Sequence, residues 1–473
     1  MSAVITPHFR RRNAQRVYEA AQAGTDRYYI GLGKNDPWLD DNDAGTYVVP
    51  TGSDLQVQEA LMNLIAIKRV DLQDSNGDIN GTDNNISFVV PNVKWTSGGV
   101  YKSWDPSDTN SFYADTASNP AYATYNNALF ICAKRGNGAS TIAPTATGTV
   151  GTIVSQNDGY SWVKIQESTN VALHPLFTKS YYPIFSITNA PTNSSGKIVR
   201  VDISPPAGTG AGLTTGTGTY TVSIIGNGTG GLATVVVSAE GVITSVTVTN
   251  AGQNYTFGTV DLSGISIANP TTYRTTGAPV LRVICAPKNG FASDPVNQLP
   301  TWFLGFTSTF DGDEGGQFLI DNGTDYRQIS LIKNPSFNED SQGLNTTALL
   351  KIKFTSGGNP PVTGKIVQFF NGNAKVGRAF VDYVDIVDNN NKFIYVHQNY
   401  STDVDLGTIT TVGNTFRVYD PVTRDLDTTV YTIAAVTPPE YLKGSGEVVF
   451  LENRGPIKRS SLQVESIKII LQF

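Results

Sequence analysis

The chain has 473 residues, of which 39% are hydrophobic and only 16% are charged, and its formal net charge is −6. This length allows two or three domains with sizeable cores, and the acidic balance argues against broad binding of nucleic-acid phosphates, which requires a basic face. The 46 glycines and 24 prolines indicate β-rich structure with many turns.

Two helices are expected, both near the amino end. Thr6 and Pro7 provide an N-cap and a favourable first position for a helix that Gly24 would stop. A second helix is expected to begin at Ser53, which forms a capping box with Gln56. The residues that follow helical spacing and should form its buried stripe are Val57, Ala60, Leu61, Leu64 and Ile65.

Nearly everything after residue 85 has the pattern of strand and turn. Loops rich in Gly, Asn and Asp separate the apolar runs. No sustained βα alternation appears, so a parallel α/β sheet is not expected. The expected strands include 86–90, 128–133, 160–165, 182–187, 327–332 and 466–473.

Two regions differ from the rest of the chain in amino-acid composition, and they are interpreted as small β modules inserted into one host domain. Residues 195–297 are rich in Gly, Thr and Val, and they contain a hairpin signal at Ala239-Glu240-Gly241. Residues 346–440 form the second region. The ends of a compact module lie close together, so an insertion disturbs the host fold little. The host segments are then 1–194, 298–345 and 441–473.

No segment of the sequence has the pattern of a signal peptide, and no apolar run approaches the ~20 residues of a membrane helix. Cys132 and Cys285 each stand alone in an apolar run, without the further Cys or His that zinc requires. We expect two buried free thiols, although a disulfide stays open. These patterns predict a protein made and folded in a cytoplasm, without metal, cofactor or membrane partner.

Motifs that would carry chemistry are incomplete. Gly226, Gly228 and Gly231 match G-x-G-x-x-G, but a β-branched alternating run follows where a dinucleotide site needs a helix. Residues 74–85 have the alternating oxygens of a calcium loop but lack its glycine and its final glutamate. An exposed loop is expected there and at the acidic residues 311–316, with adventitious Ca²⁺ binding left open.

The histidines have no nucleophile motif near them, so structural roles are expected for all three and no catalytic residue is assigned. They are His8, His174 and His397.

Near the carboxyl end, Glu452, Asn453 and Arg454 crowd together before Gly455-Pro456. Proline has no N–H donor, so the preceding strand is expected to turn or end there. Three interpretations are open: a turn held by local polar contacts, a contact with another subunit, and, least favoured, a catalytic cluster. Beyond it, the alternation of apolar residues up to Phe473 predicts a terminal core strand.

Four segments resemble a known family and occur in that family's order. GEVVFLENRGPI (446–457) resembles the carboxyl end of a baseplate wedge protein of T-even-like phages with contractile tails. YYIGLGKNDPW (28–38), GTIVSQNDGYSWVKI (151–165) and YRQISLIKNP (326–335) are similar to further segments of that family. The resemblance covers residues 1–190, 300–345 and 443–473, and neither inserted region has a counterpart.

The resemblance implies a structural role without enzymatic activity. The expected protein is mostly β, with an elongated antiparallel β-sandwich core. It is expected to be a homodimer that joins neighbouring wedge subunits in the baseplate of the virion tail, after assembly in the host cytoplasm. Its partners would be other baseplate wedge proteins, and neither nucleic acid nor a membrane. The structural or interface candidates on the matched segments are Trp38, Asp158, Trp162, Arg327, Glu452, Asn453 and Arg454.

Two other classes of function are alternatives. A receptor- or glycan-binding tail protein would be favoured by exposed aromatic platforms, and the first inserted region is poor in aromatic residues. A polysaccharide depolymerase would be favoured by solenoid repeats of short period and by clustered carboxylates, and neither pattern is visible.

Overall fold

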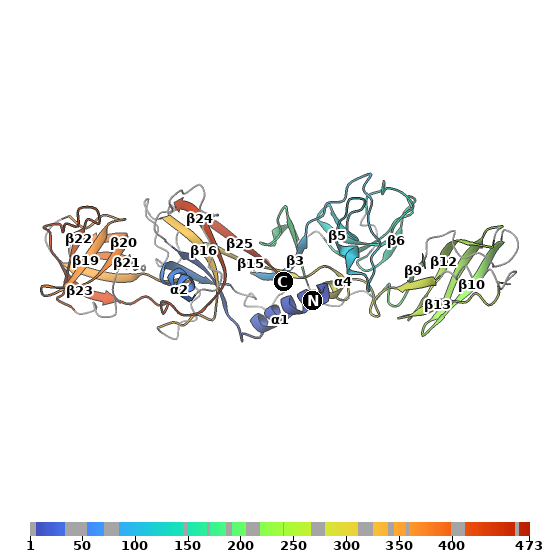
Figure 1. Ribbon diagram of the computed structural model, residues 1–473, viewed down its shortest axis with the longest axis horizontal. Helices are drawn as coiled ribbons and strands as arrows, with labels where there is room; N and C mark the ends of the chain where they lie inside the picture. Colours follow the sequence, from blue (N-terminus) through green and yellow to red (C-terminus); the bar gives the residue numbers. More distant parts are fainter. Residues whose placement is uncertain are drawn as a thin grey trace. The chain divides into compact units, whose positions relative to one another are not determined.

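Strands predominate in the protein and pair in antiparallel sheets, which confirms the mostly β, sandwich-rich fold class. The chain forms two compact units, Met1–Ala14 with Asp74–Leu304 and Gln472–Phe473, and Gln15–Gln73 with Gly305–Leu471. The computed structural model (Figure 1) describes residues 6–33, 54–70, 85–144, 149–167, 171–185, 192–204, 218–239, 241–265, 280–310, 325–338, 345–355, 359–398, 412–458 and 463–473.

The first predicted helix is confirmed as α1 (Pro7–Gln22). Thr6 Oγ1 accepts a hydrogen bond from Phe9 N at 3.2 Å, as an N-cap does. Gly24 has a positive φ of 68° just beyond the helix, a conformation that glycine adopts without strain. The remaining short helical segments are η2 (Thr109–Phe112), η3 (Val171–Leu173) and α4 (Pro295–Gln298).

The second helix, α2 (Asp54–Met62), ends before its predicted stripe does. Leu64 and Ile65 belong instead to β2 (Leu64–Arg69), which pairs with β1 (Tyr28–Gly33), so the prediction that they lie on the helix is wrong. They are nevertheless buried, because β2 is an interior strand of its sheet. The proposed cap at Ser53 lies outside the described residues.

In the first unit, a four-stranded sheet has the order β4-β5-β7-β6, and β3 pairs with β8. The predicted strands at 86–90, 128–133 and 160–165 are confirmed, and the one predicted at 182–187 is described as a strand only up to Ile184. The bounds are β3 (Ile86–Pro91), β4 (Tyr122–Tyr125), β5 (Ala128–Lys134), β6 (Ile153–Ser155), β7 (Ser161–Gln166) and β8 (Tyr181–Ile184).

The Gly-rich region of the same unit contains two sheets, with orders β12-β11-β10-β13 and β14-β9. The predicted hairpin is confirmed, since β11 and β12 pair antiparallel around the turn at Gly241. Side chains from both sheets, among them Ile198 and Val235, share one apolar core with Tyr255, which lies between β12 and β13. The bounds are β9 (Ile198–Ser204), β10 (Gly218–Gly226), β11 (Thr229–Val237), β12 (Ile243–Gln253), β13 (Gly258–Val260) and β14 (Val280–Cys285).

In the second unit, segments far apart in the sequence build one sheet with the order β17-β2-β1-β16-β24. In another sheet, β25 is the outermost strand and lies next to β15. The bounds are β1 (Tyr28–Gly33), β15 (Phe303–Phe310), β16 (Asp325–Lys333), β17 (Asn345–Thr347), β24 (Glu447–Lys458) and β25 (Glu465–Gln472).

The second unit also contains a closed barrel with the order β18-β21-β20-β19-β22-β23, drawn in orange tones in Figure 1. Its interior is filled by alternating apolar residues such as Ile352, Phe369 and Ile394. The strands lie between 346 and 440, and the status of this region as an insertion stays a prediction. The bounds are β18 (Leu350–Thr355), β19 (Ile366–Asn371), β20 (Ala374–Asp388), β21 (Asn391–His397), β22 (Thr415–Tyr419) and β23 (Tyr431–Thr437).

Candidate interface sites

The structure brings Arg327, Glu452, Asn453 and Arg454 together where β16 pairs with β24. The prediction that the strand turns or ends at Gly455-Pro456 is wrong, because β24 continues to Lys458. Two features explain this. The register shifts between Tyr326 and Gln328, which leaves the proline in a bulge, and β24 is the last of the described strands in its sheet. Proline is tolerated at a bulge on an edge strand because no ladder hydrogen bond needs its missing N–H.

The polar residues of this site form two layers. Asn453 is buried, and its Oδ1 accepts a hydrogen bond from Gln328 Nε2 at 2.8 Å, directly across the strand pair. Glu452 and Arg454 lie two residues apart, so they share one face of the strand. Their exposed side chains form an ion pair of 2.9 Å between Glu452 Oε1 and Arg454 Nη2.

Arg327 is buried beside this site. Its Nη2 lies 3.2 Å from Asp325 Oδ2, on the same strand. Burying a guanidinium requires such a paired carboxylate, because an uncompensated charge costs several kcal/mol in the interior. The sheet edge therefore has a buried ion pair between Arg327 and Asp325 and an exposed one between Arg454 and Glu452. The buried pair holds the strands locally, and the exposed pair presents a polar surface.

We expect Asn453→Ala to lower the free energy of unfolding by about 1–3 kcal/mol, because it leaves the buried Gln328 amide without this partner. Arg454→Ala should lower it by no more than about 1 kcal/mol, because exposed ion pairs contribute little. Urea denaturation of the two variants beside the wild type measures both values. Equal losses would contradict the assignment of the anchor to Asn453.

Asp158 lies in a turn before β7, where its carboxylate holds a neighbouring loop. Asp158 Oδ2 accepts hydrogen bonds from Thr141 N at 2.9 Å and Ile142 N at 3.1 Å, and Oδ1 accepts one from Tyr160 N at 3.2 Å. Burial raises the pKa of this carboxyl, but these backbone donors lower it more, so its pKa lies below the ordinary value. Gly159 follows with φ of 86°, which explains the Asp-Gly pair.

Trp162 is a core residue and offers no surface to a partner. It is 2% exposed, stacks on Tyr160 with ring centroids 6.0 Å apart, and meets the edge of Tyr101 at 5.2 Å. In the segment Asp158–Trp162, Asp158 thus fixes the loop and Trp162 fills the core. Trp38, the remaining candidate, lies outside the described residues, as do the acidic loops 74–84 and 311–316.

The glycines of the G-x-G-x-x-G match have a packing role. No helix follows them, because β11 begins at Thr229. A Cβ on Gly228 or Gly231 would come within 2.4 Å and 2.9 Å, respectively, of Tyr255. Tyr255 is buried there, and its hydroxyl donates to Ile224 O at 2.8 Å and accepts from Gly231 N at 3.1 Å. The prediction that a strand follows the motif, where a dinucleotide site needs a helix, is confirmed.

His174, His397 and both cysteines have structural contacts, and His8 lies in the first turn of α1. His174 is buried, and its Nδ1 accepts a hydrogen bond from Leu176 N at 3.1 Å. His397 Nδ1 lies 2.5 Å from Asp382 Oδ2, with both side chains buried in the barrel region. Cys132 and Cys285 are free thiols, but only Cys132 is fully buried. Within the described ranges, no three metal-ligating side chains gather, and no helix is long and apolar enough to cross a membrane.

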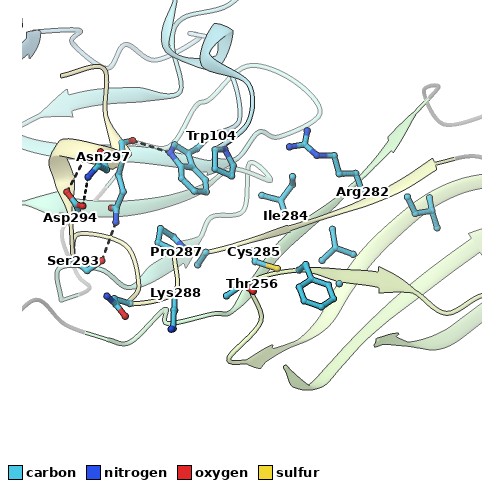
Figure 2. A pocket seen from close by; sticks show the side chains of 18 of the residues that line it. Trp104, Thr256, Arg282, Ile284, Cys285, Pro287, Lys288, Ser293, Asp294 and Asn297 are labelled. Atoms are coloured by element: carbon cyan, nitrogen blue, oxygen red, sulfur yellow. Dashed lines mark hydrogen bonds between the residues drawn. The ribbon is translucent and has the colours of Figure 1, made fainter. Parts of the chain in front are cut away.

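A groove in the first unit is a site that was not expected from the sequence. Its volume is about 760 Å³, and it runs along β14 beside the segment that contains α4. Figure 2 shows Ile284 and Cys285 of β14 and, farther along, Asp294 and Asn297 at α4. Trp104 closes part of it and donates from Nε1 to Gln298 O at 3.1 Å. The lining is mostly apolar, which is typical of a binding surface.

A bidentate ion pair fixes the wall of this groove. Arg282 Nη1 and Nη2 each lie 2.6 Å from one oxygen of Asp105, and Arg282 also contacts Ser107 Oγ. Burial raises the pKa of the Asp105 carboxyl, but the hydrogen bonds from Arg282 and Ser107 lower it more, to about 2. The pair therefore stabilises the fold above the ordinary carboxyl pKa, and this contribution disappears as the pH falls from about 4 toward 2.

The sequence contains one signal for this pair. Arg282 is the only charged residue of the apolar run LRVICAP, and Asp105 lies in WDPSD. A lone charge in an apolar strand predicts a partner across the fold, although spacing alone does not identify it.

A scan against models of known protein families finds no match to this chain, and no curated protein is significantly similar to it.

Proposed function

We propose that the chain is a structural subunit of the tail baseplate of a contractile-tailed phage, which joins neighbouring wedge subunits as a homodimer and has no enzymatic activity. The observation that carries this proposal is the position of the Glu452-Asn453-Arg454 cluster on β24, the last strand of its sheet. Three residues of the segments that carry the family resemblance have structural roles. The buried amide of Asn453 bonds to Gln328, the carboxylate of Asp158 holds a loop, and Trp162 packs in the core.

The proposal that the chain is not an enzyme is supported by the internal hydrogen bonds of side chains that could otherwise act as acids or bases. The two buried histidines are oriented by Leu176 and Asp382, and the carboxylates of Asp105 and Asp158 are occupied by internal donors. A carboxylate with a pKa near 2, such as that of Asp105, is a poor proton acceptor near neutral pH.

The experiment is co-expression of the chain with its neighbouring tail gene products, followed by negative-stain electron microscopy and light scattering. We expect the chain in a wedge-shaped assembly, and a mass of twice 50.7 kDa for the isolated protein. Arg454→Ala should remain folded and reduce assembly if the exposed ion pair meets a partner. A monomer that joins no neighbouring product would overturn the proposal.

One observation favours the second candidate, a receptor- or glycan-binding tail protein. Tyr383, Phe393 and Tyr395 lie outside the interior cluster of the barrel, and the rings of Tyr383 and Tyr395 are 5.6 Å apart, but Tyr395 is only 7% exposed. Lys351 Nζ, however, lies 4.4 Å from the centroid of Phe393, so an ammonium covers part of this aromatic face. The structural proposal therefore stays first, and a glycan array with the purified chain distinguishes the two.

A further inference from the structure

A polar hollow lies at the end of the first unit's four-stranded sheet where β5 finishes and β7 begins. Its volume is about 480 Å³, and it is lined by residues 134–139, Thr141 and 157–159. A volume of this size accepts one small organic molecule. Glycines, amides and cations predominate among the described lining residues, and none of them is aromatic. The hollow therefore suits a polar ligand and not an apolar one.

The two segments that form this hollow are fixed by internal contacts. Asp158 Oδ2 accepts from Thr141 N at 2.9 Å, and the hydroxyl of Tyr160 donates to Gly138 O at 2.8 Å. The segments touch at Gly136, where a Cβ would lie 2.5 Å from the carbonyl oxygen of Asp158. A ligand that binds to such a fixed frame orders little of the protein, so little of its binding free energy is lost.

Two cations of the lining have no carboxylate partner in the part of the chain that the structure describes. They are Lys134, which is half-buried, and Arg135, which is exposed. Asp158 supplies the single carboxylate among the described lining residues, and its oxygens already accept internal hydrogen bonds. Lysine and arginine side chains are long and flexible enough to turn toward a ligand. The lining thus has two available cations and no available anion.

The uncharged groups of the lining add hydrogen-bonding capacity. Asn137 and Asn157 are exposed, and their side-chain amides form no hydrogen bond with another described residue. A carboxamide both donates and accepts hydrogen bonds, which matches the capacity of a hydroxyl group. A ligand that satisfies the cations and the amides together has an anionic group and several hydroxyls.

We propose that this hollow binds the carboxylate or phosphate of a small, hydroxyl-rich molecule, of the class of a sugar acid or a sugar phosphate. Arg135 contacts the oxyanion directly, because a guanidinium matches two of its oxygens at once. Lys134 adds a second positive charge, and Asn137 and Asn157 bind the hydroxyls. The hollow shares no residue with the cluster on β24 that carries the proposed wedge function, so either proposal can fail without the other.

Isothermal titration calorimetry with the full chain tests the class of ligand. The probes are glucuronate and glucose 6-phosphate, with glucose as their neutral counterpart and inorganic phosphate as the bare anion. At least one charged sugar should bind with a dissociation constant of roughly 1 mM, as expected for a ligand with few contacts. Glucose and inorganic phosphate should each bind at least about tenfold more weakly, because each matches only part of the lining. The charged sugar that binds more tightly identifies the oxyanion as carboxylate or phosphate.

Single variants locate the binding in the hollow. Arg135→Ala should weaken binding of the charged sugar about tenfold, because it removes the bidentate contact. Lys134→Ala should weaken it about threefold, since a flexible ammonium acts as a point charge near solvent. Lys179→Ala is the matched control. Lys179 is exposed and also has no ion pair with a described residue, but it does not line the hollow, so the affinity should be unchanged.

Several results would contradict this proposal. They include the absence of binding at about ten times the expected dissociation constant, and binding that both Arg135→Ala and Lys134→Ala leave unchanged. Glucose binding as tight as that of the charged sugars would assign the hollow to neutral saccharides. Equally tight binding of inorganic phosphate would show a bare-ion site in which the amides have no role. Tighter binding of a peptide of acidic residues would assign the hollow to a protein partner instead.

Discussion

Deletion of residues 463–473 should yield insoluble protein, because it removes β25 and leaves β15 without its outer neighbour. The predicted terminal strand is confirmed, with Ile467 and Ile469 buried and the intervening Lys468 exposed. Each buried isoleucine contributes about 1.5–3 kcal/mol, and each lost ladder hydrogen bond about 0.5–1.5 kcal/mol. The sum is comparable with the 5–15 kcal/mol that stabilises an ordinary domain.

Point variants separate this effect from general aggregation. Ile469→Ala should destabilise the protein by about 2–5 kcal/mol, since it leaves a cavity beside the sheet. Lys468→Ala, on the opposite face of the same strand, should change stability by no more than about 0.5 kcal/mol. Soluble yield and thermal melting measure all three changes. A soluble truncated chain with an unchanged Tm would contradict the contribution assigned to β25.

Trp162→Ala should lower the free energy of unfolding by about 3–5 kcal/mol, the usual cost of removing a buried indole. The loss corresponds to a Tm decrease of roughly 10 °C. Its physical cause is the cavity left beside Tyr101 and Tyr160, which contact Trp162 through their rings. Near-ultraviolet circular dichroism during thermal unfolding follows the transition, because it reports the packing of these aromatic side chains.

Trp162→Phe is the matched control for that prediction. A phenylalanine keeps an aromatic ring against Tyr160 and leaves a much smaller cavity, so less than half of the alanine loss is expected. If both variants melted like the wild type, Trp162 would not be part of the core. If both lost the same stability, the indole would act through a specific contact and not through its packing volume.

The cluster at Glu452–Arg454 was only partly predictable from the sequence. Its polar composition and its lack of a catalytic motif were evident from the residues alone. The partner of Asn453 was not, because Gln328 lies 125 positions away in the sequence and the register of β16 against β24 brings them together. The same register decides that Pro456 occupies a bulge, where it does not end the strand.

The sequence by itself determined the local elements of this protein, because their causes are local. The cap at Thr6 and the positive φ at Gly24 bound α1, and alternating apolar residues define strands such as β5, β16 and β25. Only the tertiary structure decided which strands are neighbours and which lie at an edge. Leu64 became a strand residue because β1 was available to pair with it, and Arg282 of β14 found its partner in Asp105, which lies 177 positions away in the sequence. Strand pairing joins distant segments through backbone groups that are alike in every residue, so side-chain patterns predict a strand but not its partner.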